Sequence, residues 1–360
     1  SGFPGRHPSQ RQDRALGAGS VGDTADCPMK ALVTGGGGFL GGAIVRRLSQ
    51  RGWGVRTLQR SRYEMLDALG VEQISGDIAD AEIVDQAVSG CDIVFHVAAR
   101  VEMWGPYEPF HRTNVVGTEN VLDAMRRHDV SKLVFTSSPS VVHGRGDTEG
   151  ADESLPYPED FEAAYPQTKA MAEMAVLAAN GSDLATVALR PHLIWGPGDT
   201  NLVPQLVSRA RAGQLRFVGG GSNLVDTVYI DNAVDAHLAA ADRLEASSEC
   251  AGKAYFITNG EPWPLKEVVN GIITAAGLPP EERTIPLTAA VLAGTVFEAV
   301  HRVFPSKSGP RMTPFIARNL ATAHWYDISA AKRDLGFEPR VSIAEGLRRL
   351  RVWFEESAAV

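Results

Sequence analysis

The chain has 360 residues, 44% hydrophobic and 22% charged, which is enough for one large core with room for a smaller lobe. Its formal net charge of −8 and pI near 5.6 give no basic surface for nucleic acid. Three scattered cysteines are too few for a disulfide framework or a zinc cluster. No apolar run reaches the roughly 18 residues of a membrane span. We therefore expect free thiols, no metal site and a cytoplasmic location.

The first 28 residues are rich in Gly, Ser, Arg, Asp and Gln and poor in bulky apolar side chains. They lack the apolar centre of a secretory signal. Such a segment is typical of a cloning leader, a native extension or a mis-assigned start ahead of Met29. We expect residues 1–28 to be disordered.

A glycine-rich stretch, residues 35–42, follows the apolar run 31–33 and precedes residues 43–48, whose apolar positions have helical spacing. Gly35 can make a tight turn, Gly38 can let the backbone approach a pyrophosphate, and Gly41 can let the helix pack closely. The N–H groups at the start of the helix, around Phe39 and Leu40, would then bind phosphates. A merely flexible turn is the alternative.

Further strands are predicted over residues 55–58, 73–78, 92–99, 132–136 and 185–190, with helices over 113–125 and 164–178. This alternation predicts an α/β fold with a Rossmann-type, doubly wound parallel sheet over residues 29–190. Such sheets bind ligands beyond the carboxyl ends of their strands. After residue 190, shorter elements and Gly/Pro loops predict a smaller, partly helical substrate lobe over 191–360, interleaved with the last elements of the sheet domain.

Tyr165 and Lys169 lie four residues apart and so share one face of the predicted helix. A nearby ammonium group favours the phenolate and lowers the tyrosine pKa from about 10, which suits proton transfer near neutral pH. A solvated helix face is the alternative, because Tyr-x-x-x-Lys is common by chance. Ser137 and Ser138 favour the functional interpretation, since hydroxyls at that strand end can hydrogen-bond a substrate oxygen beside Tyr165.

These features occur in order with several other short motifs, and together they resemble the extended short-chain dehydrogenase/reductases. Within that superfamily the chain resembles the 3β-hydroxysteroid dehydrogenase-like branch. Closer still, it resembles the bacterial 2-alkyl-3-oxoalkanoate reductases of long-chain olefin biosynthesis. The other motifs and stretches that carry the resemblance are Asp77-Ile78, 96–99, 114–118, 185–199, 225–233, 254–262 and 324–326.

The resemblance implies a role for each of these residues. Tyr165 would be the general acid in ketone reduction, and Lys169 would hold the nicotinamide ribose and tune Tyr165. Ser138 would hydrogen-bond the substrate oxygen, with Ser137 as its competitor. Asp77 and Ile78 would lie at the adenine, and Ala98 and Ala99 would line the cofactor groove. The other implied cofactor-binding residues are Gly35, Gly38, Phe39, Leu40, Gly41, Arg60, Tyr165, Lys169, Pro191 and Leu193. Asn114 would have a structural role.

The choice between NAD and NADP can be argued from charge. An NAD enzyme usually places Asp or Glu about 20 residues after the glycine loop, on the ribose 2′-hydroxyl. Here the corresponding strand end is Leu58-Gln59-Arg60-Ser61, which has no carboxylate. Because Arg60 can pair with a 2′-phosphate, the sequence predicts NADP(H). A solvated turn arginine is the alternative.

Residues 287–304 are strongly apolar, but they are too short and too interrupted by Glu298 and Arg302 to span a bilayer. The first interpretation is a core helix or a helix that packs the lobe. The others are a wall or lid for a long-chain substrate and a membrane-surface helix. Candidate residues for the same cavity are Met103, Trp104, Trp195 and Trp325, with a place in the core as the alternative for isolated aromatic residues.

The predicted function is NADP(H)-dependent reduction of the 3-keto group of a long-chain 2-alkyl-3-oxoalkanoate to the 3-hydroxy acid. The expected partners are a second copy of the chain and other enzymes of olefin formation. The alternatives are a 3β-hydroxysteroid dehydrogenase, a nucleotide-sugar epimerase or dehydratase, and a cofactor-sensing regulator without catalysis. A pure sensor would have no need for Ser138, Tyr165 and Lys169 together.

Overall fold

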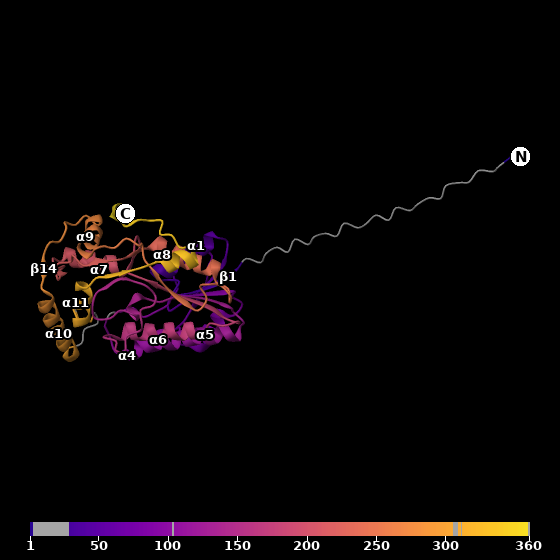
Figure 1. The fold of residues 1–360 in the computed structure, drawn as a ribbon, viewed down its shortest axis with the longest axis horizontal. Coiled ribbons are helices and arrows are strands. Elements are labelled where there is room, and N and C mark those ends of the chain that lie inside the picture. Colours follow the sequence, from indigo (N-terminus) through magenta and orange to yellow (C-terminus); the bar gives the residue numbers. More distant parts are fainter. Residues whose placement is uncertain (3–28, 103, 305–308, 311, 359–360) are drawn as a thin grey trace.

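The computed structural model describes residues 1–2, 29–102, 104–304, 309–310 and 312–358 (Figure 1). Almost all of the segment predicted to be disordered, residues 1–28, lies outside the described residues, as do Cys27 and Met103. Cys91 and Cys250 are buried free thiols, as expected. Along the described residues, no helix combines the length and apolar character needed to cross a bilayer. The cytoplasmic location stays a prediction.

A sheet of seven parallel strands forms the centre of the molecule and confirms the predicted Rossmann-type fold. The strand order is β12-β7-β5-β4-β1-β2-β3, so the chain winds in one direction from β1 and in the other from β4. Ligands bind at such a reversal, beyond the carboxyl ends of the strands. The strands are β1 (Lys30–Thr34), β2 (Gly54–Gln59), β3 (Glu72–Ser75), β4 (Ile93–His96), β5 (Lys132–Thr136), β7 (Ala185–Pro191) and β12 (Lys253–Ile257).

Helices cover both faces of this sheet because its central strands are apolar on both sides (Figure 1). On one face lie α1 (Phe39–Gln50) and α8 (Ile230–Arg243), which contact each other. On the other face α3 (Ala81–Val88), α5 (Gly117–Arg127) and α6 (Ala164–Ala178) pack side by side. Shorter pieces connect these layers: α2 (Glu64–Asp67), α4 (Tyr107–Phe110), the π-helix η1 (His111–Val116) and the 3₁₀ turn η2 (Pro139–Val141).

Several predicted boundaries differ from the structure. Two strands end earlier than predicted, at turns that side-chain hydrogen bonds stabilise. The strand predicted over residues 73–78 ends at Ser75, since Asp77 forms a turn in which its Oδ1 accepts a hydrogen bond from the Ala79 N–H (3.0 Å). The strand predicted over 92–99 ends at His96, after which the Ala98 N–H donates to Thr34 Oγ1 (3.1 Å). The helix predicted over 113–125 begins two residues earlier, as η1. The helix predicted over 164–178 coincides with α6.

The rest of the chain forms a second layer of shorter elements beyond the sheet. Helix α9 (Leu265–Ala275) packs against both α7 (Leu202–Arg211) and α12 (Ile343–Ala358). Helix α10 (Leu287–Val303) packs against α11 (Pro314–Ala321). A four-stranded sheet contains β13 (Trp263–Pro264), β10 (Leu224–Val225), β15 (His324–Tyr326) and β6 (Thr148–Ala151). The remaining elements are the pairs β8 (Ile194–Trp195) with β11 (Val228–Tyr229) and β9 (Phe217–Val218) with β14 (Thr284–Ile285), and the π-helix η3 (Ala331–Leu335).

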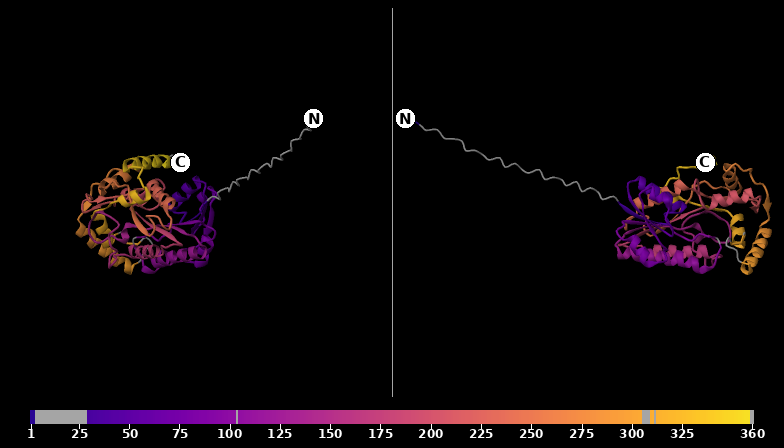
Figure 2. Two further views of the ribbon diagram at one scale, coloured as in Figure 1. Left: turned by 45° about the vertical axis from the view of Figure 1, so that its right-hand side comes forward. Right: turned by 180° about the vertical axis from the view of Figure 1, so that it is seen from behind.

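The two parts of the chain exchange elements. Strand β12 and helix α8 follow residue 190 yet belong to the large sheet and its covering layer, whereas β6 precedes residue 190 and pairs with β15. The boundary at residue 190 stays a prediction. In both views of Figure 2 the orange helix α10 lies at the opposite end of the molecule from the indigo segment of β1 and α1.

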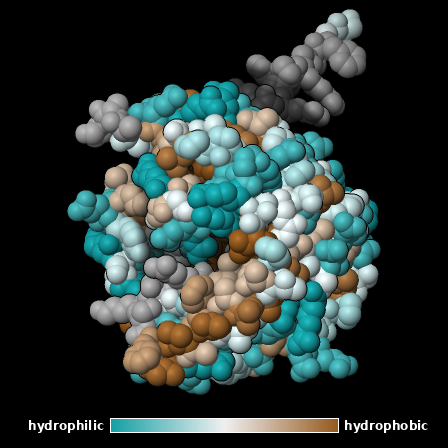
Figure 3. Space-filling model, turned by 90° about the vertical axis from the view of Figure 1, so that its left-hand side faces the viewer, coloured by the Kyte–Doolittle hydropathy of each residue, from teal (hydrophilic) through white to brown (hydrophobic). Residues whose placement is uncertain are grey.

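Helix α10 packs against α11, so for residues 287–304 the structure agrees with a helix that packs the lobe rather than with a core helix. Its buried residues are Ala290 and Gly294, on the side that packs against α11. A Cβ on Gly294 would lie 2.7 Å from the Thr313 carbonyl carbon, so this glycine allows the close packing. Other apolar side chains of α10 remain exposed, and Figure 3 shows a band of hydrophobic surface on this end of the molecule. They include Leu292, Val296, Val300 and Val303.

Candidate active site

The glycine loop lies directly after β1, where the winding of the sheet reverses. Gly35 adopts a left-handed conformation (φ +71°), and a Cβ there would lie 3.0 Å from the Cα of Ala98. A Cβ on Gly41 would lie 2.2 Å from the Gly35 carbonyl oxygen, so α1 approaches the loop as closely as predicted. Gly38 is the N-cap of α1, and its N–H donates to the Gly35 carbonyl (2.9 Å).

The first turn of α1 is suited to binding an anion. No described side chain caps this helix, and the first backbone bond of the turn joins the Gly42 N–H to the Gly38 carbonyl (2.8 Å). The N–H groups of Phe39, Leu40 and Gly41 therefore stand at the open end of the helix, where its dipole favours negative charge. The loop and the helix start together fit the pyrophosphate of a dinucleotide.

The end of β2 carries the residues that are predicted to determine the preference for NADP(H) over NAD. Gln59 is buried, and its side-chain amide donates to Oε1 of Gln73 (3.1 Å). Arg60 follows in an exposed position, whereas Arg62 is paired with Asp67. The role of Arg60 stays a prediction.

One side chain at this edge was missed in the sequence. Tyr63 lies across Gly37, and a Cβ on that glycine would lie 2.1 Å from the tyrosine ring. The contact gives Gly37 a packing role, and the ring covers part of the loop. No sequence motif pointed to Tyr63, because its approach to Gly37 depends on the fold of the turn after β2.

The remaining predicted cofactor residues follow the ends of other strands of the sheet. After β3, Asp77 is paired with Arg112 (3.2 Å), and Ile78 is buried beneath Gly117. After β4, Ala98 contacts Gly35 as described, and Ala99 is half-buried. These groups gather at the carboxyl edge, as parallel strands require.

At the end of β7, Pro191 is buried and Leu193 has a left-handed conformation (φ +46°) with its side chain exposed. A branched residue in that conformation is strained, and such strain is typical of functional loops. Asn114 links η1 to α6, because its side chain bonds both Arg100 backbone groups and donates to Thr168 Oγ1 (3.0 Å).

Tyr165 stands in the first turn of α6, close to the two serines that follow β5. Burial raises the pKa of Tyr165, and hydrogen bonding with Ser138 and Ser140 works in the opposite direction. The predicted lowering of this pKa by Lys169 is therefore wrong for the protein without cofactor. Ser138 Oγ in turn accepts a hydrogen bond from Ser140 Oγ (3.0 Å), while Ser137 is buried with no described partner for its hydroxyl. Ser140 was missed, although it stands two residues after Ser138.

Lys169 is buried, and its ammonium group is turned toward the sheet. Its Nζ donates to the Thr136 carbonyl (2.6 Å) and lies 4.1 Å from the centre of the Phe135 ring. Burial lowers the pKa of Lys169 to about 7, against a smaller opposing effect of the Glu173 charge. A half-neutral ammonium that points at a carbonyl stabilises a phenolate less than the sequence suggested.

A buried ion pair lies one helical turn beyond Lys169. Glu173 and Arg190 are joined by hydrogen bonds of 2.6 and 3.0 Å, and the Tyr157 hydroxyl donates to Glu173 Oε1 (2.7 Å). The pair connects α6 to β7 beneath the site and fixes the face of α6 that carries Lys169. The i, i+4 spacing from Lys169 to Glu173 was the available signal, and the sequence interpretation did not use it.

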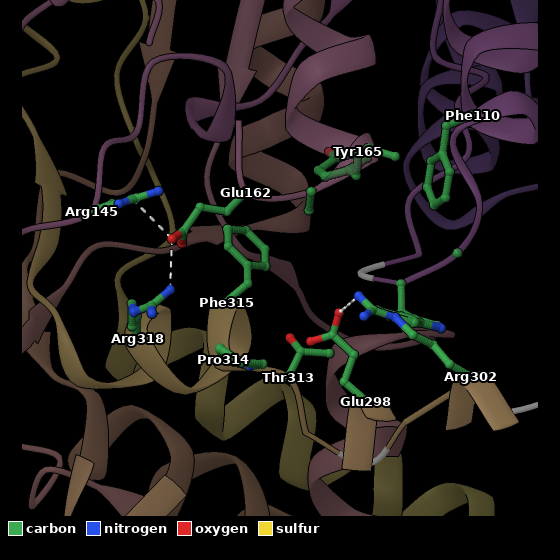
Figure 4. A pocket seen from close by; sticks show the side chains of 14 residues that line it. Phe110, Arg145, Glu162, Tyr165, Glu298, Arg302, Thr313, Pro314, Phe315 and Arg318 are labelled. Carbon is green, nitrogen blue, oxygen red and sulfur yellow. Dashed lines mark hydrogen bonds and ion pairs between the residues drawn. The ribbon is translucent and has the colours of Figure 1, made fainter. Parts of the chain in front are cut away.

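A cavity of about 480 Å³ opens beside Tyr165 (Figure 4). Trp104 lines it, as predicted, together with aromatic and charged side chains. Trp195 does not, because it is fully buried in the core with its Nε1 donating to Thr227 (3.0 Å). Trp325 also lies away from the lining residues. The other lining residues are Gly105, Phe110, Arg145, Glu162, Ala163, Ala164, Glu298, Arg302, Thr313, Pro314, Phe315 and Arg318.

Comparison with known proteins identifies the family. Residues 32–288 match the model of the 3-beta hydroxysteroid dehydrogenase/isomerase family. The chain belongs to this family. It is an oxidoreductase that uses a nicotinamide dinucleotide, and the ketoreductase interpretation of the sequence agrees with its relatives.

Two curated relatives carry the same name, 2-alkyl-3-oxoalkanoate reductase. The one from Stenotrophomonas maltophilia is 52% identical over 90% of this chain and 98% of its own length. The one from Shewanella oneidensis is 46% identical over 89% of this chain and 85% of its own length. Among solved structures, that of gox2253 is similar with a TM-score of 0.74 and 26% identity, over 91% of this chain and 98% of that one.

Proposed function

We propose that this protein reduces the 3-keto group of a long-chain 2-alkyl-3-oxoalkanoate to the 3-hydroxy acid, with NADPH, in long-chain olefin biosynthesis. The similarity to the two reductases of that name carries the proposal. The cavity of about 480 Å³ beside Tyr165 supports it, because the predicted proton donor is one of the residues that line it.

The bound nicotinamide supplies hydride to the ketone carbon. In the proposal, Tyr165 donates its hydroxyl proton to the oxygen that gains negative charge, and the Ser138 hydroxyl donates a hydrogen bond to the same oxygen. Ser140 helps to orient Ser138 through the bond between the two hydroxyls. In its protonated form, Lys169 has two ammonium hydrogens beyond the one that it donates to the Thr136 carbonyl. In the proposal these two hydrogens are donated to the hydroxyls of the nicotinamide ribose.

The preference for NADP(H) rests on the end of β2. Residues 58–62 contain no carboxylate that would repel a 2′-phosphate, and Arg60 is exposed directly after the end of β2. A guanidinium can hold a phosphate through two hydrogen bonds. Arg62 is a weaker candidate for this contact, since it is already paired with Asp67.

The partners that we propose are a second copy of the chain and other enzymes of the same pathway. The exposed apolar side of α10 supports a protein contact at that end of the molecule, because monomeric proteins rarely expose such patches. Light scattering of the purified protein tests the homodimer, and a monomer at micromolar concentration would contradict it.

The decisive experiment follows NADPH and NADH absorbance with the purified protein and a panel of substrates. The panel contains a 2-alkyl-3-oxoalkanoate, a 3-hydroxysteroid with the oxidised cofactor, and a UDP-sugar. We expect turnover with the 3-oxo acid and NADPH. Faster turnover of the steroid would instead indicate a 3β-hydroxysteroid dehydrogenase. Conversion of the UDP-sugar would instead indicate a nucleotide-sugar epimerase or dehydratase.

A further inference from the structure

The cavity beside Tyr165 is lined by five charged side chains from separate parts of the chain. Arg145 follows η2, Glu162 precedes α6, Glu298 and Arg302 lie on α10, and Arg318 lies on α11. Three guanidinium groups and two carboxylates leave one net positive charge on the lining. The guanidinium groups offer charged hydrogen-bond donors to an anionic ligand in this cavity.

The excess charge lies at Glu162, where two arginines share one carboxylate (Figure 4). Glu162 Oε1 accepts a hydrogen bond from Arg318 Nη1 (2.7 Å) and lies 3.1 Å from Arg145 Nε. The carboxylate is 18% exposed, whereas the Arg318 and Arg145 side chains are 40% and 75% exposed. Each guanidinium has five N–H groups, so most of their donors remain accessible to a ligand.

The second charged pair of the cavity is balanced. Arg302 Nη2 donates to Glu298 Oε1 (2.8 Å), and both residues lie on the same face of α10, four positions apart. Figure 4 shows this pair across the cavity from Glu162. A single anion that enters the cavity is therefore attracted mainly to Arg145 and Arg318.

We propose that Arg145 and Arg318, held in place by Glu162, form the subsite for the carboxylate of the substrate. This inference rests on the proposed function, in which the group that accepts hydride lies two carbons from the carboxyl carbon. The subsite would hold the acid end while the ketone oxygen lies at Tyr165. It would also distinguish a 3-oxo acid from an uncharged ketone of the same chain length.

The net charge of the lining favours a carboxylate over a diphosphate. One carboxylate balances the single excess positive charge, whereas the pyrophosphate of a nucleotide sugar carries about two negative charges. A steroid alcohol carries no charge and would gain no charge-assisted hydrogen bond from Arg145 and Arg318. The charge thus supports the acid class of substrate independently of sequence similarity.

The test uses stable substrates in the oxidative direction: a 2-alkyl-3-hydroxyalkanoic acid and its methyl ester, each with NADP⁺. In the wild-type protein we expect a KM for the acid at least tenfold below that for the ester. The Arg318→Gln variant should raise the KM for the acid about 10- to 100-fold, as expected for loss of a charge-assisted hydrogen bond. Its KM for the ester should change less than threefold. The matched control is Arg126→Gln, which removes an arginine paired with Asp123 on α5 and should change neither KM.

A second variant separates ligand binding from a structural role of the same side chains. Glu162→Gln removes the anion that competes for both arginines, so the KM for the acid should fall while that for the ester stays the same. If the arginines merely join α11 to the segment before α6, Glu162→Gln should instead raise both KM values and lower the melting temperature. That result would overturn the subsite.

The failures of the two proposals are distinguishable. Wild-type protein that oxidises neither the acid nor the ester refutes the proposed function. Wild-type protein that oxidises both with equal KM refutes the subsite alone. Equal changes for acid and ester in the Arg318→Gln variant also refute the subsite and leave the reaction class intact.

Discussion

Replacing Lys169 by methionine should make the protein without cofactor more stable at neutral pH and, at the same time, inactive. Lys169 is 3% exposed, and burial lowers its pKa from 10.5 to about 7. A difference of one pKa unit between the folded and unfolded states corresponds to about 1.4 kcal/mol. Burying the Lys169 amine therefore costs roughly 4 kcal/mol of folding free energy at pH 7.

The stability that the Lys169→Met substitution removes is smaller than this cost of burial. The Lys169→Met variant loses the hydrogen bond to the Thr136 carbonyl, which costs about 1–3 kcal/mol if that oxygen finds no other donor. The contact with the Phe135 ring is largely kept, because a methionine sulfur also packs well on aromatic rings. The net gain is roughly 1–3 kcal/mol at pH 7, or about 1–4 °C in melting temperature for a chain of this length.

The pH dependence provides the sharper measurement. A lysine with a depressed pKa in the folded state destabilises the protein fully below pH 7, and this cost disappears as the pH rises toward 10.5. The advantage of the variant should therefore shrink above pH 7 and reverse between about pH 8 and pH 10, where the cost of burial falls below the value of the hydrogen bond that Lys169 keeps. Differential scanning fluorimetry at pH 6, 7, 9 and 10 without cofactor measures this.

The matched control is Lys253→Met, at an exposed lysine on β12 paired with Glu249 and Asp334. A surface pair of this kind is worth about 0–1 kcal/mol, so this variant should show no gain at any pH. A Lys169→Met variant that is less stable than wild type at pH 6–7, or whose advantage does not depend on pH, would refute the reasoning about burial.

Three further changes test the site residues. Tyr165→Phe should lower kcat by about two to four orders of magnitude and leave the Kd of NADPH unchanged, so near-normal turnover would contradict its role as proton donor. Arg60→Glu should raise the KM for NADPH about 10- to 100-fold and shift the ratio of kcat/KM values toward NADH, whereas an unchanged ratio would make Arg60 a solvated turn residue. Gly41→Ala should destabilise the protein by about 1–3 kcal/mol and weaken NADPH binding, because the new Cβ would overlap the Gly35 carbonyl. Its control is Gly181→Ala, where a Cβ has no neighbour within 4 Å, and equal melting temperatures for the two variants would contradict the packing argument.

The sheet and the grouping of Tyr165 with Ser138 could be predicted because their signals are local. Strands β1, β4, β5 and β7 are apolar runs buried on both faces, and α6 coincides with its predicted bounds. The glycine loop works within one turn between a strand and a helix. Tyr165, Lys169 and Ser138 are likewise fixed by one helix face and one strand end, so their juxtaposition follows from short-range geometry.

The errors arose where a property depends on the environment in the folded chain. The pKa of Tyr165 was predicted from the spacing to Lys169 alone, but burial and the direction of the lysine side chain decide it. For residues 287–304 the sequence left a core helix, a lobe-packing helix and an exposed wall open, because composition does not say which side of a helix is covered. Trp195 was a candidate for the cavity and is instead part of the core.

The proposed carboxylate subsite could not be predicted from the sequence because it is assembled from distant parts of the chain. Arg145 and Arg318 come from opposite halves of the sequence and meet only through Glu162. No spacing rule connects them, and each reads as an ordinary surface arginine. The proposed hydride transfer uses groups at neighbouring strand ends and on one helix, whereas α10 and α11 contribute to the lining of the cavity. In our proposal the carboxylate is recognised away from the reacting groups, so Arg318 on α11 is the position whose substitution tests substrate choice without removing the proposed proton donor.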